Sequence, residues 1–312
     1  MINHAEKSAE KSPEKPVVRP AEDLTGNPAV YWEALDLQVV RCTLCPHFCR
    51  IKPGKKGICN ARANQDGQLI AESYGRITSL ALDPIEKKPL YRFHSGSQIL
   101  SAGSYGCNFR CGFCQNWTIS QGIAPNRLIM PDELVARAAD LRSQGNIGLA
   151  YTYNEPLVGF EYVLDCARLA HQDNLVNVLV TNGSINPEPM EELLPWIDAM
   201  NIDLKAWQPE FYTDICKGSL QPVLDTITQC AARCHVEVTT LLIPGLNDQD
   251  KDVESIARWL ASIRTDLPLH LTRHHPDYQM NNHQPIGRDR LLRLVEIARK
   301  SLKYVYPGNL PL

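Results

Sequence analysis

From about residue 99 onward, short apolar runs alternate with longer segments in which apolar residues recur at a helical spacing. The apolar runs predict strands at 99–106, 147–154, 176–183, 199–206, 235–245, 267–276 and 303–309. The segments between them predict helices at 131–145, 157–172, 222–234, 252–263 and 288–302. Strands that alternate with helices indicate parallel βα units, so we predict an α/β fold with a partial or complete TIM-type barrel.

The predicted strands end in polar or glycine-rich residues. The endings of six strands read YGCN, YNEP, TNG, DLK, PGLND and RHHP. In a parallel barrel, polar residues that follow the strands form the active site at the C-terminal rim. We therefore expect the chemistry of the protein at these strand ends.

The residues before the barrel divide into two parts. Residues 1–28 are rich in Lys, Glu, Pro, Ser and Ala, so they bury little apolar surface and are predicted to be a disordered tail. Residues 29–95 contain a group of cysteines and two strand-like runs, which predicts a small cysteine-rich module. The barrel domain is predicted to span residues 96–312.

Composition narrows the choice of compartment and partner. Apolar residues make up 44% of the chain and charged residues 21%, and the formal net charge is −3. These values give no indication of nucleic acid or an anionic membrane as partner. No apolar run reaches the roughly 18 residues of a spanning helix, and residues 1–23 lack the apolar core of a secretory signal. We expect a cytoplasmic protein that binds neither membrane nor nucleic acid.

Eleven cysteines are unusual in a protein of this kind. In a reducing compartment, clustered cysteines are more typical of metal binding or catalysis than of disulfides. Seven of them form two clusters, which are described below. The other four lie in helix-like runs, where we expect ordinary packing: Cys166, Cys216, Cys230 and Cys234.

Cys107, Cys111 and Cys114 follow the first predicted barrel strand with the spacing C-x3-C-x2-C. Three thiolates on one short loop suit an iron–sulfur cluster, because soft sulfur ligands select such clusters, zinc or cuprous copper. Structural zinc needs a fourth ligand, and none is evident nearby. Three cysteines for four irons leave one iron open to a substrate or cofactor. We therefore predict a 4Fe–4S cluster at this loop.

Four further cysteines lie together in the N-terminal module: Cys42, Cys45, Cys49 and Cys59. The loop around them is basic, which favours thiolates. Four thiolates fit either structural zinc or a second iron–sulfur cluster, and the spacing does not decide between the two. The expected role is structural, because four protein ligands leave no open position. An electron relay is the alternative if this module packs beside the first cluster, and disulfide pairing is a third interpretation.

C-x3-C-x2-C after the first strand of a βα barrel is the signature of the radical S-adenosylmethionine (SAM) superfamily. The string LYRFHSGSQILSAGSYGCNFRCGFCQNWTISQ, with CTLCPHFC, YTYNEP, VTNG, NIDLK, LLIPGLND and RHHPDY, resembles the radical SAM enzyme of the AmmeMemoRadiSam system. That group is similar to pyruvate formate-lyase activating enzymes. The resemblance covers residues 35 to 310 approximately and implies a radical SAM barrel with a 4Fe–4S cluster and SAM as cofactors.

The resemblance also implies cofactor-binding residues at four strand ends: Asn154 and Glu155, Thr181 and Asn182, Asp203 and Lys205, and His275. Glu155 would accept a hydrogen bond from the SAM amino group, and Lys205 and His275 would reach its carboxylate. Thr181 and Asn182 would lie near the ribose or the methionine part. Each group also has a structural interpretation: a helix cap, a turn, an internal ion pair and a packing histidine.

Three hypotheses of function follow. In the first, the chain is an enzyme that reductively cleaves SAM to a 5′-deoxyadenosyl radical, which abstracts hydrogen from an unidentified substrate. In the second, it is a glycyl-radical-enzyme activase that acts on a partner protein. In the third, it is a non-catalytic interaction module that binds zinc. Either enzyme would need an electron donor such as flavodoxin or ferredoxin and a substrate, which is a small molecule or a protein.

Overall fold

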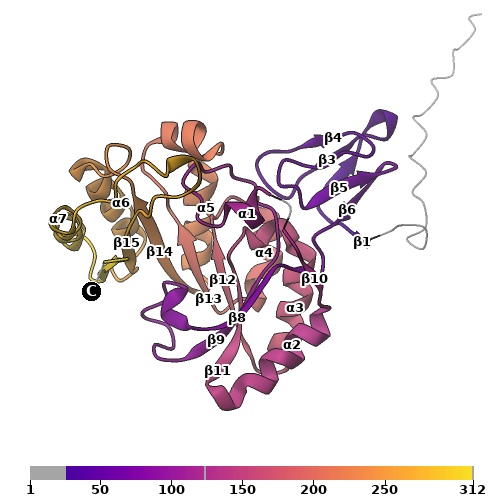
Figure 1. Ribbon diagram of the computed structural model, residues 1–312, viewed down its shortest axis with the longest axis horizontal. Helices are drawn as coiled ribbons and strands as arrows, with labels where there is room; N and C mark the ends of the chain where they lie inside the picture. The colour runs from indigo at the N-terminus through magenta and orange to yellow at the C-terminus, as the bar shows by residue number, and fades with distance from the viewer. Residues whose placement is uncertain (1–25, 123, 311–312) are drawn as a thin grey trace, which may run out of the picture.

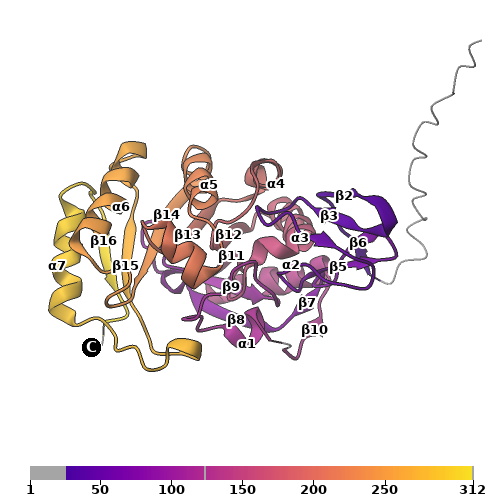
Figure 2. The ribbon, with the colours of Figure 1, turned by 90° about the horizontal axis from the view of Figure 1, so that it is seen from above.

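The computed structural model describes residues 26–122 and 124–310, so most of the tail predicted at 1–28 lies outside the described residues. An eight-stranded sheet forms the centre of the molecule (Figures 1 and 2). In spatial order its strands are β16 (Val305–Gly308), β15 (Leu269–Arg273), β14 (His235–Leu242), β13 (Ala199–Asp203), β12 (Val176–Thr181), β11 (Asn146–Tyr151), β9 (Gln98–Gly103) and β8 (Ser79–Pro84).

The order and direction of these strands confirm the predicted α/β barrel class. All neighbours from β9 to β16 pair in parallel, as the alternating pattern predicts. Strands β16 and β8 lie at opposite edges of the sheet, so the described strands form a partial barrel rather than a closed one.

Amphipathic helices connect the strands and pack against the sheet. They are α2 (Pro131–Asp140), α3 (Phe160–Gln172), α4 (Pro187–Leu193), α5 (Gln221–Ala231), α6 (Asp250–Ile263) and α7 (Arg288–Arg299), and the short α1 (Trp117–Ser120) follows the cysteine loop. In α6, Val253, Ile256, Ala257 and Leu260 are buried, which is the spacing of one helical face. Proline occupies the first turn of α2, α4 and α5, where its missing N–H costs little.

Several helical elements were not predicted from the sequence, among them α1, α4 and a π-helix. Helix α4 is short and contains two prolines, so no helical repeat develops in it. Residues Phe211–Cys216 form a π-helix, η7, which has no distinct sequence signature. Short 3-10 turns complete the connections and include η3 (Ile85–Lys87) and η5 (Pro156–Gly159).

The N-terminal residues form small sheets beside the large one, at the upper right in Figure 1. One consists of β1 (Asn27–Pro28), β6 (Gln68–Ala71) and β5 (Arg62–Gln65), and the other of β2 (Trp32–Ala34), β3 (Val40–Cys42) and β4 (Arg50–Ile51). A further pair joins β7 (Arg76–Ile77) to β10 (Arg127–Leu128), which follows α1. Strands β2 to β7 lie within the range 29–95 given to the cysteine-rich module, whereas β1 falls in the range of the predicted tail and β10 in that of the barrel domain.

The large sheet extends beyond the predicted boundary at residue 96. Strand β8 lies within the range assigned to the module, but six of its residues pair with β9 in antiparallel register. Hydrogen bonding therefore assigns β8 to the barrel sheet. One of the two strand-like runs expected in the module, residues 76–83, is thus divided between β7 and β8. No helix in the described part of the chain is long and apolar enough to cross a membrane.

Candidate active site

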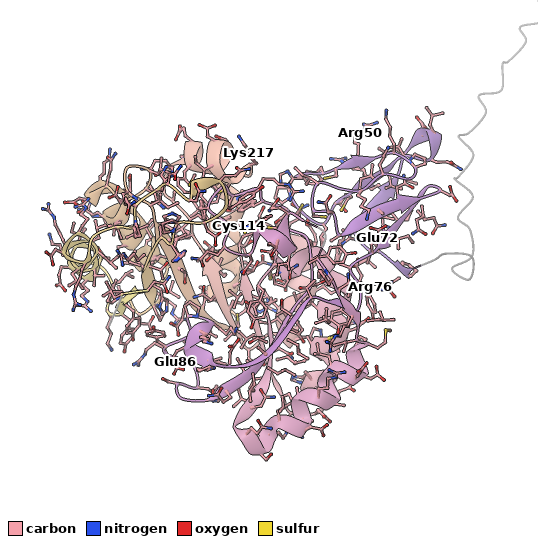
Figure 3. The ribbon with its side chains drawn as sticks, in the orientation of Figure 1. Arg50, Glu72, Arg76, Glu86, Cys114 and Lys217 are labelled. Atoms are coloured by element: carbon pink, nitrogen blue, oxygen red, sulfur yellow. The ribbon has the colours of Figure 1, made fainter. Side chains whose placement is uncertain are left out.

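A cavity of about 400 Å³ opens at the carboxyl ends of the parallel strands. Its lining includes the three loop cysteines and six of the predicted cofactor-binding residues: Cys107, Cys111, Cys114, Asn154, Glu155, Thr181, Asn182, Asp203 and Lys205. Figure 3 labels Cys114 beside α1, near the upper ends of the strands in that view. The structure thus brings together residues that are almost 100 positions apart in the chain.

His275 is the exception among the predicted residues. It lies two residues beyond the end of β15, its side chain is exposed, and it is not part of the cavity lining. The neighbouring His274 is buried instead. We therefore assign His275 no role in the site proposed below.

The cysteine loop runs from the end of β9 to α1. The Phe109 amide donates to the Cys107 thiol at 3.3 Å, and the Asn182 side-chain amide lies 3.7 Å from the same sulfur. Burial raises the pKa of the Cys107 and Cys114 thiols, so both are protonated at neutral pH in the absence of metal. Because iron binds thiolates, cluster assembly at this loop would release protons.

Cys216 contacts the cysteine loop through Cys111. The sequence did not predict this contact. It is fully buried at the end of the π-helix η7, and its hydrogen bond with Cys111 is the main cause of the raised pKa of the Cys111 thiol. Its carbonyl accepts from the Arg110 amide at 2.7 Å. π-helical turns are frequent at functional sites. The expectation of ordinary packing for Cys216 is therefore incomplete, because this residue supports the cysteine loop.

Asn154 holds the backbone that leads into the cysteine loop. Its side-chain oxygen accepts from the Ser104 amide at 2.9 Å, and its side-chain nitrogen donates to the carbonyls of Tyr105 and Gly106 at 3.1 and 3.0 Å. These bonds use most of the hydrogen-bonding capacity of the amide group. Asn154 therefore positions the loop, and it also lines the cavity in which the family resemblance implies contact with the cofactor.

Glu155 is a buried carboxylate with three protein donors. One oxygen accepts from the Thr181 hydroxyl at 2.7 Å and from the Leu157 amide at 3.1 Å, and the other accepts from the Asn182 amide at 2.7 Å. The bond to Leu157 caps η5, as the alternative interpretation of Asn-Glu-Pro expected. Burial nevertheless raises the pKa of Glu155 to about 7. The carboxylate oxygen that accepts only from Asn182 can still accept a hydrogen bond from an ammonium group.

Thr181 and Asn182 connect the end of β12 to both neighbours. Besides its bond to Glu155, the Thr181 hydroxyl accepts from the Gly183 amide at 3.1 Å. The Asn182 side chain donates to the Asn108 side chain at 2.9 Å and accepts from the Ser184 amide at 2.8 Å. The turn interpretation of Thr-Asn-Gly therefore describes the hydrogen bonds, and the same residues line the cavity.

Asp203 and Lys205 lie at the end of β13 and form an ion pair of 2.8 Å. Burial alone would lower the pKa of Lys205, but Asp203 and the Cys111 and Cys216 thiols raise it well above its usual value. The lysine is therefore a permanent cation beside the cysteine loop. The internal ion pair of the structural interpretation is thus present, and Lys205 also lines the cavity.

The sequence did not predict a buried cluster of Asp83, Lys88 and Tyr153 beside the cavity. Lys88, 2% exposed, donates to Asp83 at 2.8 Å, and the Tyr153 hydroxyl donates to the same carboxylate oxygen at 2.6 Å. Lys88 and Tyr153 line the cavity. In the sequence, DPIEKKPL (83–90) reads as a polar connection. The pairing of β8 with β9 places this segment beside the cavity, where Lys88 belongs to the lining.

The donor set fits a metal cluster better than a single metal ion. Within residues 26–122 and 124–310, no group of three or more His, Cys, Asp or Glu side chains is arranged to hold one metal ion. A 4Fe–4S cluster instead spreads its cysteine ligands over several iron atoms. Three soft thiols on one loop, facing a cavity that holds both a carboxylate and a lysine, are suited to such a cluster and a zwitterionic ligand.

Comparison with known proteins identifies the family. Residues 102–260 match the model of the Radical SAM superfamily, and this chain belongs to that superfamily. It is therefore a radical SAM enzyme, and its cofactors are a 4Fe–4S cluster and SAM, as predicted. Membership in this superfamily of enzymes decides against the hypothesis of a non-catalytic zinc-binding module.

The chain is also similar to individual proteins. An uncharacterised protein of Methanocaldococcus jannaschii is 42% identical over 289 residues, which cover 91% of this chain and 85% of that protein. The indoleacetate decarboxylase activating enzyme of Tractidigestivibacter scatoligenes is 23% identical over 72% of this chain and 74% of its own length. A radical SAM methyltransferase structure from Sphaerobacter thermophilus has a TM-score of 0.54 and 18% identity, covering 69% of this chain and 67% of that one, which supports the fold alone.

Proposed function

We propose that Cys107, Cys111 and Cys114 ligate three irons of a 4Fe–4S cluster and that SAM binds the open iron in the adjoining cavity. The observation that carries this proposal is the meeting of the cysteine loop with Glu155 and Lys205 around one cavity of about 400 Å³. When bound, the reduced cluster and SAM supply a 5′-deoxyadenosyl radical that abstracts hydrogen from the substrate.

The residues of the chain orient the cofactor in this proposal. Glu155 accepts from the SAM ammonium group, and Lys205 attracts its carboxylate. Thr181 and Asn182 keep the Glu155 carboxylate in place through the bonds described above. Asn154 fixes the backbone directly before Cys107 through its bonds to the Tyr105 and Gly106 carbonyls. A pair of opposite charges fits a zwitterion better than a purely anionic ligand.

The experiment is SAM cleavage by the anaerobically reconstituted protein. With a chemical reductant, the wild-type protein is expected to convert SAM into methionine and 5′-deoxyadenosine. The Cys107→Ala variant is expected to lose this activity, whereas Cys234→Ala, a cysteine far from the cavity lining, should keep it. Cleavage of SAM by Cys107→Ala at the wild-type rate would contradict the proposal.

The second candidate function is that of an activase that generates a radical on a partner protein. The similarity to an enzyme named for activating a decarboxylase favours it. The natural reductant in either case is a low-potential donor such as flavodoxin or ferredoxin, and the abundance of cysteine suits the cytoplasm. Deuterium transfer from a labelled partner protein or a labelled small molecule into 5′-deoxyadenosine would separate the two candidates.

A further inference from the structure

The four cysteines of the N-terminal module surround one small enclosed cavity. Cys42 ends β3, Cys45 and Cys49 lie in the turn between β3 and β4, and Cys59 lies shortly before β5. All four cysteines line this cavity, together with Leu44, Ile51 and Val158. The fold of the module thus brings its four cysteines to the wall of one cavity, together with apolar side chains and Arg62.

Backbone amides already orient three of these thiols. The backbone of Leu44 hydrogen-bonds to the Cys42 thiol, that of His47 to Cys45 and that of Ala61 to Cys59. Each amide comes two residues after its cysteine. Phe109 donates to Cys107 in the same way in the barrel loop. Hydrogen bonds of this kind stabilise thiolates and orient metal ligands.

Arg62 provides a second, independent indication of a ligand. Its side chain is 1% exposed and lines the same cavity. One terminal nitrogen donates to Glu161 at 2.9 Å, but Nε and the other terminal nitrogen have no hydrogen-bond partner in the described part of the chain. Buried guanidinium donors without acceptors are costly, so an acceptor belongs in this cavity.

The cavity also lies directly against the barrel loop. The Cys107 amide donates to the Cys59 carbonyl at 3.2 Å, so one hydrogen bond joins a cysteine of each cluster. The His47 ring contacts the Asn108 carbonyl at 2.7 Å, and the Asn108 side chain hydrogen-bonds to the Cys45 thiol. The condition for an electron relay, that the module packs beside the first site, is therefore met.

We propose that Cys42, Cys45, Cys49 and Cys59 hold a second 4Fe–4S cluster, which transfers electrons to the cluster at Cys107, Cys111 and Cys114. Bound zinc would add no acceptor for the two Arg62 donors beyond the four thiolates, and it carries no electrons. An iron–sulfur cluster adds inorganic sulfides as acceptors and is redox-active. Four protein ligands leave no open iron, so this site would not bind SAM.

The electron balance of the relay is simple. A low-potential one-electron donor, such as reduced flavodoxin or ferredoxin, reduces the N-terminal cluster by one electron. That cluster returns to its oxidised state when the electron passes to the barrel cluster, and no bond forms or breaks. This role rests on the proposed function, whereas the identity of the metal does not.

The metal is tested on the full chain by elemental analysis after anaerobic reconstitution. The wild-type protein is expected to contain about eight irons and eight sulfides, and the Cys107→Ala/Cys111→Ala/Cys114→Ala variant about four of each, without zinc. The reduced variant should show the paramagnetic signal of a single cluster. Four irons with one zinc in the wild type, or zinc without iron in the variant, would overturn the proposal. The iron and sulfide content of the wild-type protein tests the proposal even if the variant fails to fold.

The relay is tested by comparing two reductants. In the Cys42→Ser/Cys45→Ser variant, the ratio of flavodoxin-supported to dithionite-supported SAM cleavage is expected to fall at least tenfold. An unchanged ratio would refute the relay and leave the metal assignment to the elemental analysis. Absence of dithionite-supported cleavage in the wild type would instead refute the proposed function, so the two failures are distinguishable.

Discussion

At the scale of single residues, Glu155 combines a structural and a proposed functional role. Its carboxylate ties the ends of β11 and β12 together, and its burial raises its pKa from 4.5 to about 7. Because the folded-state pKa lies above the unfolded one, its contribution favours folding below about pH 4.5 and is lost as the pH rises through about 7. The folded protein thus favours the protonated carboxyl, whereas binding of an ammonium group requires the ionised carboxylate.

The affinity for SAM should therefore increase with pH. We expect the dissociation constant of the reconstituted protein to fall up to tenfold per pH unit between about pH 6 and 7, where the pKa of Glu155 limits binding. In Glu155→Gln this dependence should vanish, and the affinity at pH 8 should drop roughly tenfold to a hundredfold with the lost charge-assisted bond. Calorimetric titration at several pH values measures both. An equal pH dependence in the variant would refute the role of Glu155.

Lys88 and Lys87 provide a matched pair, because both donate to Asp83. The Lys88 side chain is 3% exposed and that of Lys87 is 68% exposed. Lys88→Met is expected to destabilise the protein by about 3 kcal/mol, because it breaks a buried ion pair. Lys87→Met should cost less than about 1 kcal/mol, as exposed pairs do. Denaturant unfolding checks both values, and similar losses would contradict the burial argument.

At the scale of elements, the contact between the module and the barrel loop depends on Gly106. Its φ of +89° is left-handed, and a Cβ added there would lie well inside van der Waals contact of the Cys59 carbonyl. A larger residue would therefore push apart the two segments that carry the cysteine clusters. No other residue type satisfies both demands at this position.

Gly106→Ala is predicted to reduce the iron content of the reconstituted protein at least twofold and to lower its thermal midpoint. The control is Gly96→Ala, which has a similar φ of +84° but no atom within 4 Å of the added Cβ. That variant should show only the backbone strain of about 1 kcal/mol and a normal iron content. Equal iron contents in the two variants would show that the close approach to Cys59 is unimportant.

The elements also show what could be predicted from the sequence. The parallel strands β9 and β11 to β16 were predicted because apolar periodicity is a local property. The polar residues at the strand ends indicated Glu155 and Lys205 as candidate site residues. The role of Lys88 could not be predicted, since it depends on the antiparallel pairing of β8. Cys216 was read as a packing residue because the contact between η7 and the cysteine loop is set by tertiary structure.

At the scale of the whole molecule, one buried ion pair fastens the module to the barrel. Arg62 in β5 lies 2.9 Å from Glu161 in α3, and the two side chains are 1% and 7% exposed. The same carboxylate oxygen accepts from the Val30 amide at 2.8 Å. The pair therefore holds two segments of the module on one barrel helix.

Loss of this pair should loosen the module. Glu161→Gln is expected to destabilise the protein by roughly 3–5 kcal/mol, because it leaves the buried Arg62 without a counter-charge. Limited proteolysis should then cut between the module and the barrel faster than in the wild type. Glu254→Gln removes the partner of Arg258 in an exposed pair and should change stability by no more than about 0.5 kcal/mol. Comparable stability of the two variants would contradict this view.

The hydrogen bond from Cys107 to Cys59 has a consequence for the biosynthesis of the protein. Residues 42–59 leave the ribosome before the barrel loop, so all four cysteines of the N-terminal site are available while the parallel sheet is still unsynthesised. Metal binding contributes folding free energy to a small module. Nascent chains stalled after β8 should therefore already retain iron and sulfide, and metal-free chains would contradict this order. The metal-bound module would then offer the Cys59 carbonyl as a hydrogen-bond acceptor for Cys107 while the radical-generating loop folds.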